Sequence, residues 1–125
     1  MSEKKKILIV EDETDFAKIV RMRLESVGYA VSVAVDAYQG TQMIVKNDYD
    51  LVILDLGLPA GGGFALLERI RNMPAKSAIP VVILTGKTID DEIRAKAKAN
   101  DVAAIFSKPY DSKEFVRKLK SIVPV

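Results

Sequence analysis

The chain has 125 residues, of which 49% are hydrophobic and 29% are charged, and its formal net charge is +2. This composition indicates one globular domain and excludes a mainly disordered chain. The small net charge gives no reason to expect binding to nucleic acid or to a membrane surface. The sequence contains no cysteine and no histidine, so disulfides, thiol chemistry and histidine-based catalysis are excluded.

Five short apolar runs alternate with five stretches of helical spacing. The apolar runs are 7–10, 30–35, 51–54, 80–84 and 102–106, and the helical stretches are 16–27, 37–46, 64–71, 89–99 and 111–122. Uninterrupted Val/Ile/Leu runs are typical of strands covered on both faces, whereas the more alternating run 30–35 indicates an edge strand. The alternation predicts an α/β fold: a doubly wound, five-stranded parallel sheet that forms one domain over residues 1–125.

Helical spacing also predicts how some of these stretches pack and where they end. The apolar face of the first helix is expected to contain Phe16, Ile19, Val20, Leu24 and Val27. Gly28 follows it where a left-handed residue is favoured, and Asp111 with Glu114 predicts a capping box at the start of the last helix. The run 7–10 is too short for a signal peptide and no segment is long enough to span a membrane, so we expect a cytoplasmic protein.

Polar residues follow four of the predicted strands. Glu11 and Asp12 follow the first, Asp55 the third, Thr85 the fourth and Lys108 the fifth. Parallel strands bring their carboxyl ends to one edge of the sheet, where ligands bind in open α/β sheets. Three carboxylates that converge there repel one another, which a hard divalent cation such as Mg²⁺ would relieve. With a lysine and a hydroxyl that suit phosphate oxygens, the set predicts phosphoryl transfer onto Asp55.

These segments resemble the receiver domain of two-component response regulators, of the single-domain chemotaxis-regulator type, over essentially the whole chain. The matching pieces are ILIVED (7–12), YDLVILDLGLP (49–59), GFALLERIR (63–71), PVVILTGK (80–87) and SKPY (107–110). The intervals agree as well, with 43 residues from Asp12 to Asp55, 30 more to Thr85 and 23 more to Lys108. The resemblance implies a flavodoxin-like (βα)5 receiver fold with strand order 2-1-3-4-5.

The resemblance also implies a role for each residue of the acidic group. Asp55 would be the phosphoacceptor, and Asp12 would bind Mg²⁺ directly. Glu11, in place of the commoner aspartate, would act on the ion through water. Gly57 would contribute its backbone carbonyl to the metal.

Residues of the fourth and fifth strands would sense the phosphoryl group. The resemblance makes Thr85 the switch hydroxyl, places Gly86 beside it, and pairs Lys108 with the phosphoryl group. It also implies a cis peptide bond before Pro109, although only about 5–6% of the bonds that precede proline in folded proteins are cis.

Besides Glu11, two features depart from the family pattern. Ile105 occupies the position where the family usually has an aromatic switch residue, and Phe106 cannot replace it because adjacent strand residues point to opposite faces. The aromatic part of activation is therefore in doubt, while the phosphorylation chemistry is expected to survive. Gly57 and Lys87 flank the route of attacking water, so we expect an altered phosphoryl lifetime.

The expected function is a phosphorylation-activated signalling switch, not a conventional enzyme. A sensor histidine kinase or histidine phosphotransfer protein would donate the phosphoryl group, and the domain would be a monomer or a weak phosphorylation-dependent dimer. An acidic protein partner would bind the basic last two helices, unless these residues are only solvated surface: Arg94, Lys96, Lys98, Lys113, Arg117, Lys118 and Lys120. We expect no direct binding of nucleic acid or membrane, and no DNA-binding or catalytic output segment in these residues.

Three other functions compete with this one. A receiver-like protein-interaction module that is never phosphorylated stays open because of Ile105. An aspartate-nucleophile phosphatase would need a second Asp where Gly57 stands. A flavin mononucleotide module would need a hydroxyl- and glycine-rich loop after the first strand, where the sequence EDETD (11–15) would repel phosphate.

Overall fold

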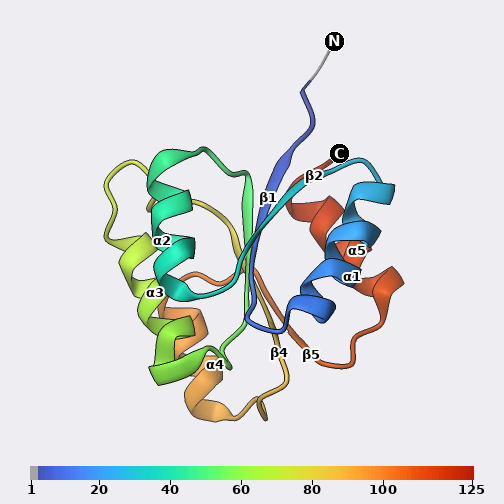
Figure 1. Ribbon diagram of the computed structural model, residues 1–125. Coiled ribbons are helices and arrows are strands. Elements are labelled where there is room, and N and C mark those ends of the chain that lie inside the picture. Colours follow the sequence, from blue (N-terminus) through green and yellow to red (C-terminus); the bar gives the residue numbers. More distant parts are fainter. Residues whose placement is uncertain (1–2) are drawn as a thin grey trace.

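A computed structural model describes residues 3–125 and shows one parallel sheet between two layers of helices (Figure 1). The strands are β1 (Lys6–Val10), β2 (Ala30–Ala34), β3 (Leu51–Leu54), β4 (Val81–Thr85) and β5 (Ala104–Ser107). The helices are α1 (Thr14–Ser26), α2 (Ala37–Lys46), α3 (Gly62–Arg71), α4 (Asp91–Ala99) and α5 (Ser112–Ile122), with a short 3₁₀ helix, η1 (Pro59–Gly61), before α3. All neighbouring strands are parallel in the order β2-β1-β3-β4-β5, which confirms the predicted fold.

The two faces of the sheet bury alternate residues of the same strands. In β1, Ile7 and Ile9 pack in the cluster that includes residues of α1 and α5, whereas Leu8 and Val10 pack with residues of α2 and α3. Figure 1 shows the same division, with α1 and α5 on one side of the sheet and α2, α3 and α4 on the other. Because strand side chains alternate, burial on both faces requires the uninterrupted apolar runs seen in the sequence.

The predicted bounds agree with the structure to within two residues, and the largest shifts have local causes. β5 begins at Ala104 and not at residue 102, because the Val102 N–H donates to the Ala97 carbonyl (3.0 Å) in the turn that ends α4. Helix α4 begins at Asp91 because the Asp90 side chain caps it, accepting from the Ile93 N–H at 2.8 Å. The predicted single domain over 1–125 stays a prediction, and residues 1–2 lie outside the described part of the chain.

Helix α1 packs through a face that differs in part from the predicted one. Ala17, Val20 and Leu24 are its buried residues, while Ile19 is 57% exposed, so the placement of Ile19 on the apolar face was wrong. The i, i+3, i+7 spacing of the buried residues leaves Ile19 outside the contact with the sheet. Gly28 has φ +111°, as predicted for the residue that follows the helix.

Helix α5 begins with the predicted acidic cap. The Asp111 carboxylate accepts hydrogen bonds from the N–H groups of Lys113 and Glu114, both at 3.0 Å. Among residues 3–125, no helix combines the length and the apolar character needed to cross a membrane.

The guanidinium of Arg71, at the end of α3, joins the loops that precede β4 and β5. It donates to the backbone carbonyls of Ile79 (2.6 Å), Asn100 (2.7 Å), Ser77 (3.2 Å) and Asp101 (3.4 Å). One side chain thus satisfies carbonyls of two loops that are separate in sequence, which stabilises the entry of both strands into the sheet.

Candidate functional site

The candidate site lies at the carboxyl edge of the sheet, where the backbone continues the strand pairing beyond the last strand residues. The Asp55 N–H donates to the Val10 carbonyl at 3.2 Å, and the Glu11 N–H donates to the Ala34 carbonyl at 3.0 Å. Both acidic residues are therefore held by main-chain bonds of their own, next to the ends of β1 and β3. Such support keeps a side chain in place more firmly than a free loop does.

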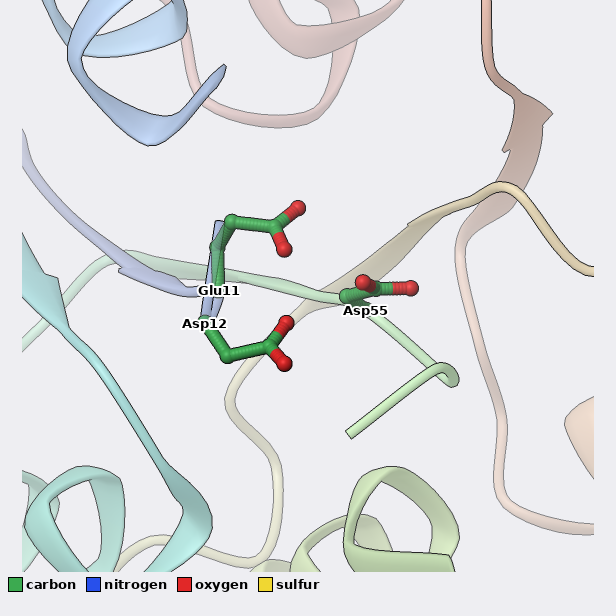
Figure 2. Close-up of side chains that lie close together, drawn as sticks. All are labelled: Glu11, Asp12 and Asp55. Carbon is green, nitrogen blue, oxygen red and sulfur yellow. The ribbon is translucent and has the colours of Figure 1, made fainter. Parts of the chain in front are cut away.

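Three carboxylates converge at this edge, as the parallel topology predicts. Glu11, Asp12 and Asp55 each offer one oxygen, and these three oxygens lie within 4.8 Å of one another. Figure 2 shows the side chains projecting from the ends of β1 and β3 into a common space. Glu11 and Asp55 are buried, whereas Asp12 is exposed. A set of hard oxygen donors, open to solvent on one side, suits a cation such as Mg²⁺ that retains several waters.

Gly57 supports Asp55 from the turn that follows β3. Its N–H donates to Asp55 Oδ1 at 2.9 Å, and a Cβ at this position would lie 3.3 Å from both carboxylate oxygens. Glycine therefore leaves the acceptor carboxylate uncrowded. The predicted part of the Gly57 carbonyl in metal binding stays a prediction.

Lys108 reaches the acidic group from the loop after β5. Its ammonium Nζ lies 2.6 Å from Glu11 Oε1, 3.3 Å from Asp55 Oδ2 and 3.5 Å from Glu13 Oε1, and the side chain is only 13% exposed. The peptide bond between Lys108 and Pro109 is cis. The structure thus brings Lys108 together with the carboxylates in the way that the strand ends predict.

Thr85 lies fully buried at the end of β4, on the same edge. Its hydroxyl accepts a hydrogen bond from the Lys87 N–H at 3.2 Å and helps to lower the pKa of Asp55. Gly86 is exposed, and a Cβ there would meet only the Lys108 side chain, at 3.8 Å. Because Gly86 has no side chain, the space beside Thr85 stays open.

The two buried carboxyls have pKa values shifted in opposite directions. Burial raises the pKa of Glu11, and the negative charge of Asp55 raises it further. The hydrogen bonds from Lys108 and the Glu13 N–H lower this pKa, but they offset only part of the rise, so the pKa moves from 4.5 to about 7. Burial also raises the pKa of Asp55, but the Gly57 N–H, the Thr85 hydroxyl and Lys108 outweigh it, so the net pKa lies below its ordinary value. Asp55 is therefore the carboxylate whose ionised form the site favours.

Lys108 is the cation that compensates these carboxylates. Burial disfavours its charged form, but the hydrogen bond and charge of Glu11, together with Asp55, outweigh that effect and raise the pKa of Lys108. A fixed positive charge beside Asp55 suits the recognition of phosphate oxygens.

Ile105 and Phe106 lie on opposite faces of β5, as the alternation predicts. Ile105 packs against the cluster of Leu56, Ile83 and Ala97 on the α4 side. Phe106 packs on the other side, where its ring meets Phe115 edge-to-face with centroids 5.1 Å apart. The β5 position to which the resemblance assigns an aromatic switch residue thus holds Ile105, and Phe106 faces away from it.

The basic residues of the last two helices have different surroundings. On α4, Lys96 is paired with Glu92 at 3.6 Å. On α5, Lys113, Arg117 and Lys120 face α1, where they line a groove of about 460 Å³ together with Arg23. Helices α4 and α5 lie on opposite sides of the sheet (Figure 1). Arg117 and Lys118 of α5 also line a second groove, with Ala104 and Phe106 of β5.

Two contacts of Lys108 were not predicted from the sequence. The Glu13 carboxylate approaches it at 3.5 Å, and the ring of Phe16 lies under it with the ammonium 4.2 Å from the centroid. Phe16 was assigned to the apolar face of the first helix, and the helical spacing carries no signal of a contact with a distant loop.

Comparisons with known proteins agree with this geometry. The sequence matches the family described as the response regulator receiver domain over residues 7–120. The transcriptional regulatory protein RprY of Bacteroides fragilis is 31% identical over 125 residues, which cover 98% of this chain and 51% of RprY. The DNA-binding dual master transcriptional regulator RpaA of Synechocystis is 32% identical over 120 residues, which cover 94% of this chain and 48% of RpaA. The chain spans about half the length of the curated relatives it matches.

Solved structures show the same architecture. The non-phosphorylated receiver domain of HemR from Leptospira biflexa is 32% identical, with a TM-score of 0.86 over 98% of this chain and 96% of that one. The chemotaxis protein CheY4 of Vibrio cholerae has a TM-score of 0.89, covering 97% and 100% of the two chains, but at 24% identity it shows the fold alone. The family match and the relatives above 30% identity, on a sheet with the receiver strand order, show that this chain belongs to the response regulator receiver domains of two-component systems.

Proposed function

We propose that this domain is a switch in which Asp55 accepts a phosphoryl group from a phosphohistidine of a sensor kinase or phosphotransfer protein. The observation that carries the proposal is the environment of Asp55. It is buried, its pKa is lowered, and its two oxygens are held by the Gly57 N–H and the Lys108 ammonium. An ionised carboxylate at a sheet edge that also offers phosphate-binding groups is suited to act as a nucleophile toward phosphorus.

In the proposed step, a carboxylate oxygen of Asp55 attacks phosphorus and forms a P–O bond. The P–N bond to the donor imidazole breaks, its electron pair stays on the nitrogen, and that nitrogen takes a proton from solvent. Lys108 and Thr85 would bind the phosphoryl oxygens, with Gly86 leaving room for them. The product is an acyl phosphate on Asp55.

The acidic group fits a divalent cation by its donor chemistry and spacing. Glu11, Asp12, Asp55 and the carbonyl of Gly57 would hold Mg²⁺. When bound, the ion offsets the repulsion between the acceptor carboxylate and the phosphoryl oxygens.

The phosphorylated domain would act through a protein partner. The groove between α1 and α5 carries positive charge from both helices, and Lys113, Arg117 and Lys120 form no ion pair within residues 3–125. We therefore place the docking site of an acidic partner on α5, with α4 contributing the more weakly charged part of the surface. Reversal of charge at Arg117 should weaken this docking more than reversal at Lys96, which already has an acidic neighbour.

The test of phosphorylation uses acetyl phosphate with MgCl₂, followed by intact-protein mass spectrometry. Wild-type protein should gain the mass of one phosphoryl group, labile to alkali, and Asp55→Asn should gain none. Asp91→Asn, which changes an exposed residue in the first turn of α4, is the matched control and should be labelled as wild type is. If wild-type protein gains no adduct, the proposal is overturned, and the protein-interaction module that is never phosphorylated is favoured.

A further inference from the structure

The ammonium of Lys108 has an aromatic neighbour as well as its acidic ones. Nζ lies 4.2 Å from the centroid of the Phe16 ring, in the first turn of α1. The ring faces a cation that is largely removed from solvent, with a side chain only 13% exposed. A cation over an aromatic face at this distance is attracted by the ring quadrupole, and the attraction is stronger when the cation is desolvated.

We propose that Phe16 is a positioning residue for Lys108, whose ammonium it holds within reach of the phosphoryl group on Asp55. The inference rests on the proposed function of Asp55. Lysine is a flexible side chain that loses rotamer entropy when it is held in one place, so a defined position requires partners that persist through the reaction.

The acidic partners of Lys108 do not persist in this way. Glu11 and Asp55 are the carboxylates that a divalent cation would share, and Asp55 is the group that would become esterified. Glu13 is 68% exposed, and its contact at 3.5 Å is long and screened by water. The neutral ring of Phe16 does not change charge and offers no oxygen to a cation. Of the neighbours of Lys108, it is therefore the one that neither cation binding nor phosphorylation would itself alter.

The ring itself is anchored to the loop that carries Lys108. Tyr110, two residues after Lys108, meets Phe16 edge-to-face with centroids 6.1 Å apart and meets Phe115 of α5 at 4.9 Å. These edge-to-face contacts between the three rings fix the start of α1 against the loop between β5 and α5. Ile105 gives the site no aromatic ring from β5, and the ring that contacts Lys108 is that of Phe16 in α1.

The test compares Phe16→Leu, which removes the π face and keeps an apolar side chain, with Phe16→Tyr, which keeps the π face. A proton near the face of an aromatic ring is shifted upfield, so NMR of the Lys108 side chain measures the contact directly. Wild type and Phe16→Tyr should show upfield-shifted Hε signals of Lys108, and Phe16→Leu should show signals near those of a free lysine. Phe64→Leu is the matched control: Lys96 lies over the Phe64 ring at 5.2 Å, so only the Lys96 signals should move.

The second readout is the rate at which acetyl phosphate and MgCl₂ label Asp55. Because loss of one cation–π contact weakens the placement of Lys108, Phe16→Leu should be labelled about three to ten times more slowly, and Phe16→Tyr at the wild-type rate. If Phe16→Leu is too unstable to measure, Phe16→Met replaces it, since its flexible thioether chain fits irregular space.

Equal Lys108 shifts in wild type and Phe16→Leu would overturn the inference, as would equal slowing in the leucine and tyrosine variants. Failure of the proposed function looks different, because wild type itself would not be labelled. The Lys108 shift then decides the contact by itself.

Discussion

Replacing Glu11 by glutamine should stabilise the protein at alkaline pH, although it removes a partner of Lys108. Burial raises the pKa of Glu11 from 4.5 to about 7, so the folded state favours the protonated carboxyl. This contribution to stability is complete below pH 4.5 and is lost as the pH rises through 7. A difference of 2.5 in pKa, at about 1.4 kcal/mol per unit, corresponds to about 3 kcal/mol. Glutamine resembles the protonated form at every pH.

The assay is urea unfolding followed by circular dichroism, between pH 5 and pH 9 with EDTA present. Glu11→Gln should match wild type near pH 5 and exceed it by up to about 3 kcal/mol at pH 8. Glu13→Gln is the matched control: its side chain is 68% exposed, so the change should stay within about 0.5 kcal/mol. A Glu11→Gln variant that is less stable than wild type at pH 8, or that differs by the same amount at every pH, would refute the reasoning.

The same variant tests the cation site. A ligand that binds only the folded state stabilises it, by about 1.4 kcal/mol at ten times its dissociation constant. MgCl₂ should therefore stabilise wild type more than Glu11→Gln, and the gain for wild type should grow as Glu11 loses its proton near pH 7. Equal gains in the two proteins at pH 8 would show that Glu11 takes no part in cation binding.

Three further variants test the fold around the site, each measured by urea unfolding. Arg71→Met leaves the carbonyls of two loops without their donor and should lower the free energy of unfolding by about 2–4 kcal/mol, whereas Lys118→Met on the surface should not. Tyr29→Phe loses the bond from its hydroxyl to the Val123 carbonyl, about 1 kcal/mol. Burial raises the pKa of Tyr29 above 10, so wild type should lose further stability above pH 10 and the variant should not. Gly63→Ala places a Cβ 2.7 Å from the Asp55 backbone oxygen, and should cost about 1–3 kcal/mol and slow labelling by acetyl phosphate.

The fold could be predicted from the sequence because burial on both faces leaves a strong local signal. Every residue of β3 and β4 is buried, and the matching sequence runs are uninterrupted. The strand order has no such signal, since it depends on which strands pair across the sheet, and it came from the family resemblance alone. Ile19 and Val20 show the limit of helical spacing: two adjacent apolar residues both fit the pattern, and only the packing angle of α1 buries Val20 and exposes Ile19.

The site could be predicted where a residue directly follows a strand. Asp55 and Lys108 meet because parallel strands end at one edge, a consequence of topology that the sequence carries. Phe16 and Glu13 reach the same lysine from the start of α1 and the turn before it. Their positions depend on how α1 packs against the loop after β5, and no local pattern encodes a contact between segments so far apart in the chain.

Glu11 and Asp55 are the same kind of residue at the same edge of the sheet, yet their surroundings give them different chemistry. Asp55 accepts from the Gly57 N–H and is stabilised by Thr85 and Lys108, so its charge is favourable without any ion. Glu11 is buried with fewer compensating donors, so its ionisation is unfavourable even beside Lys108, and a bound cation would offset that cost. The first environment suits a nucleophile, and the second suits a ligand whose charge a metal would stabilise. A buried carboxyl that costs stability in the free domain is expected at a functional site, because the same uncompensated charge supplies the affinity for a cation.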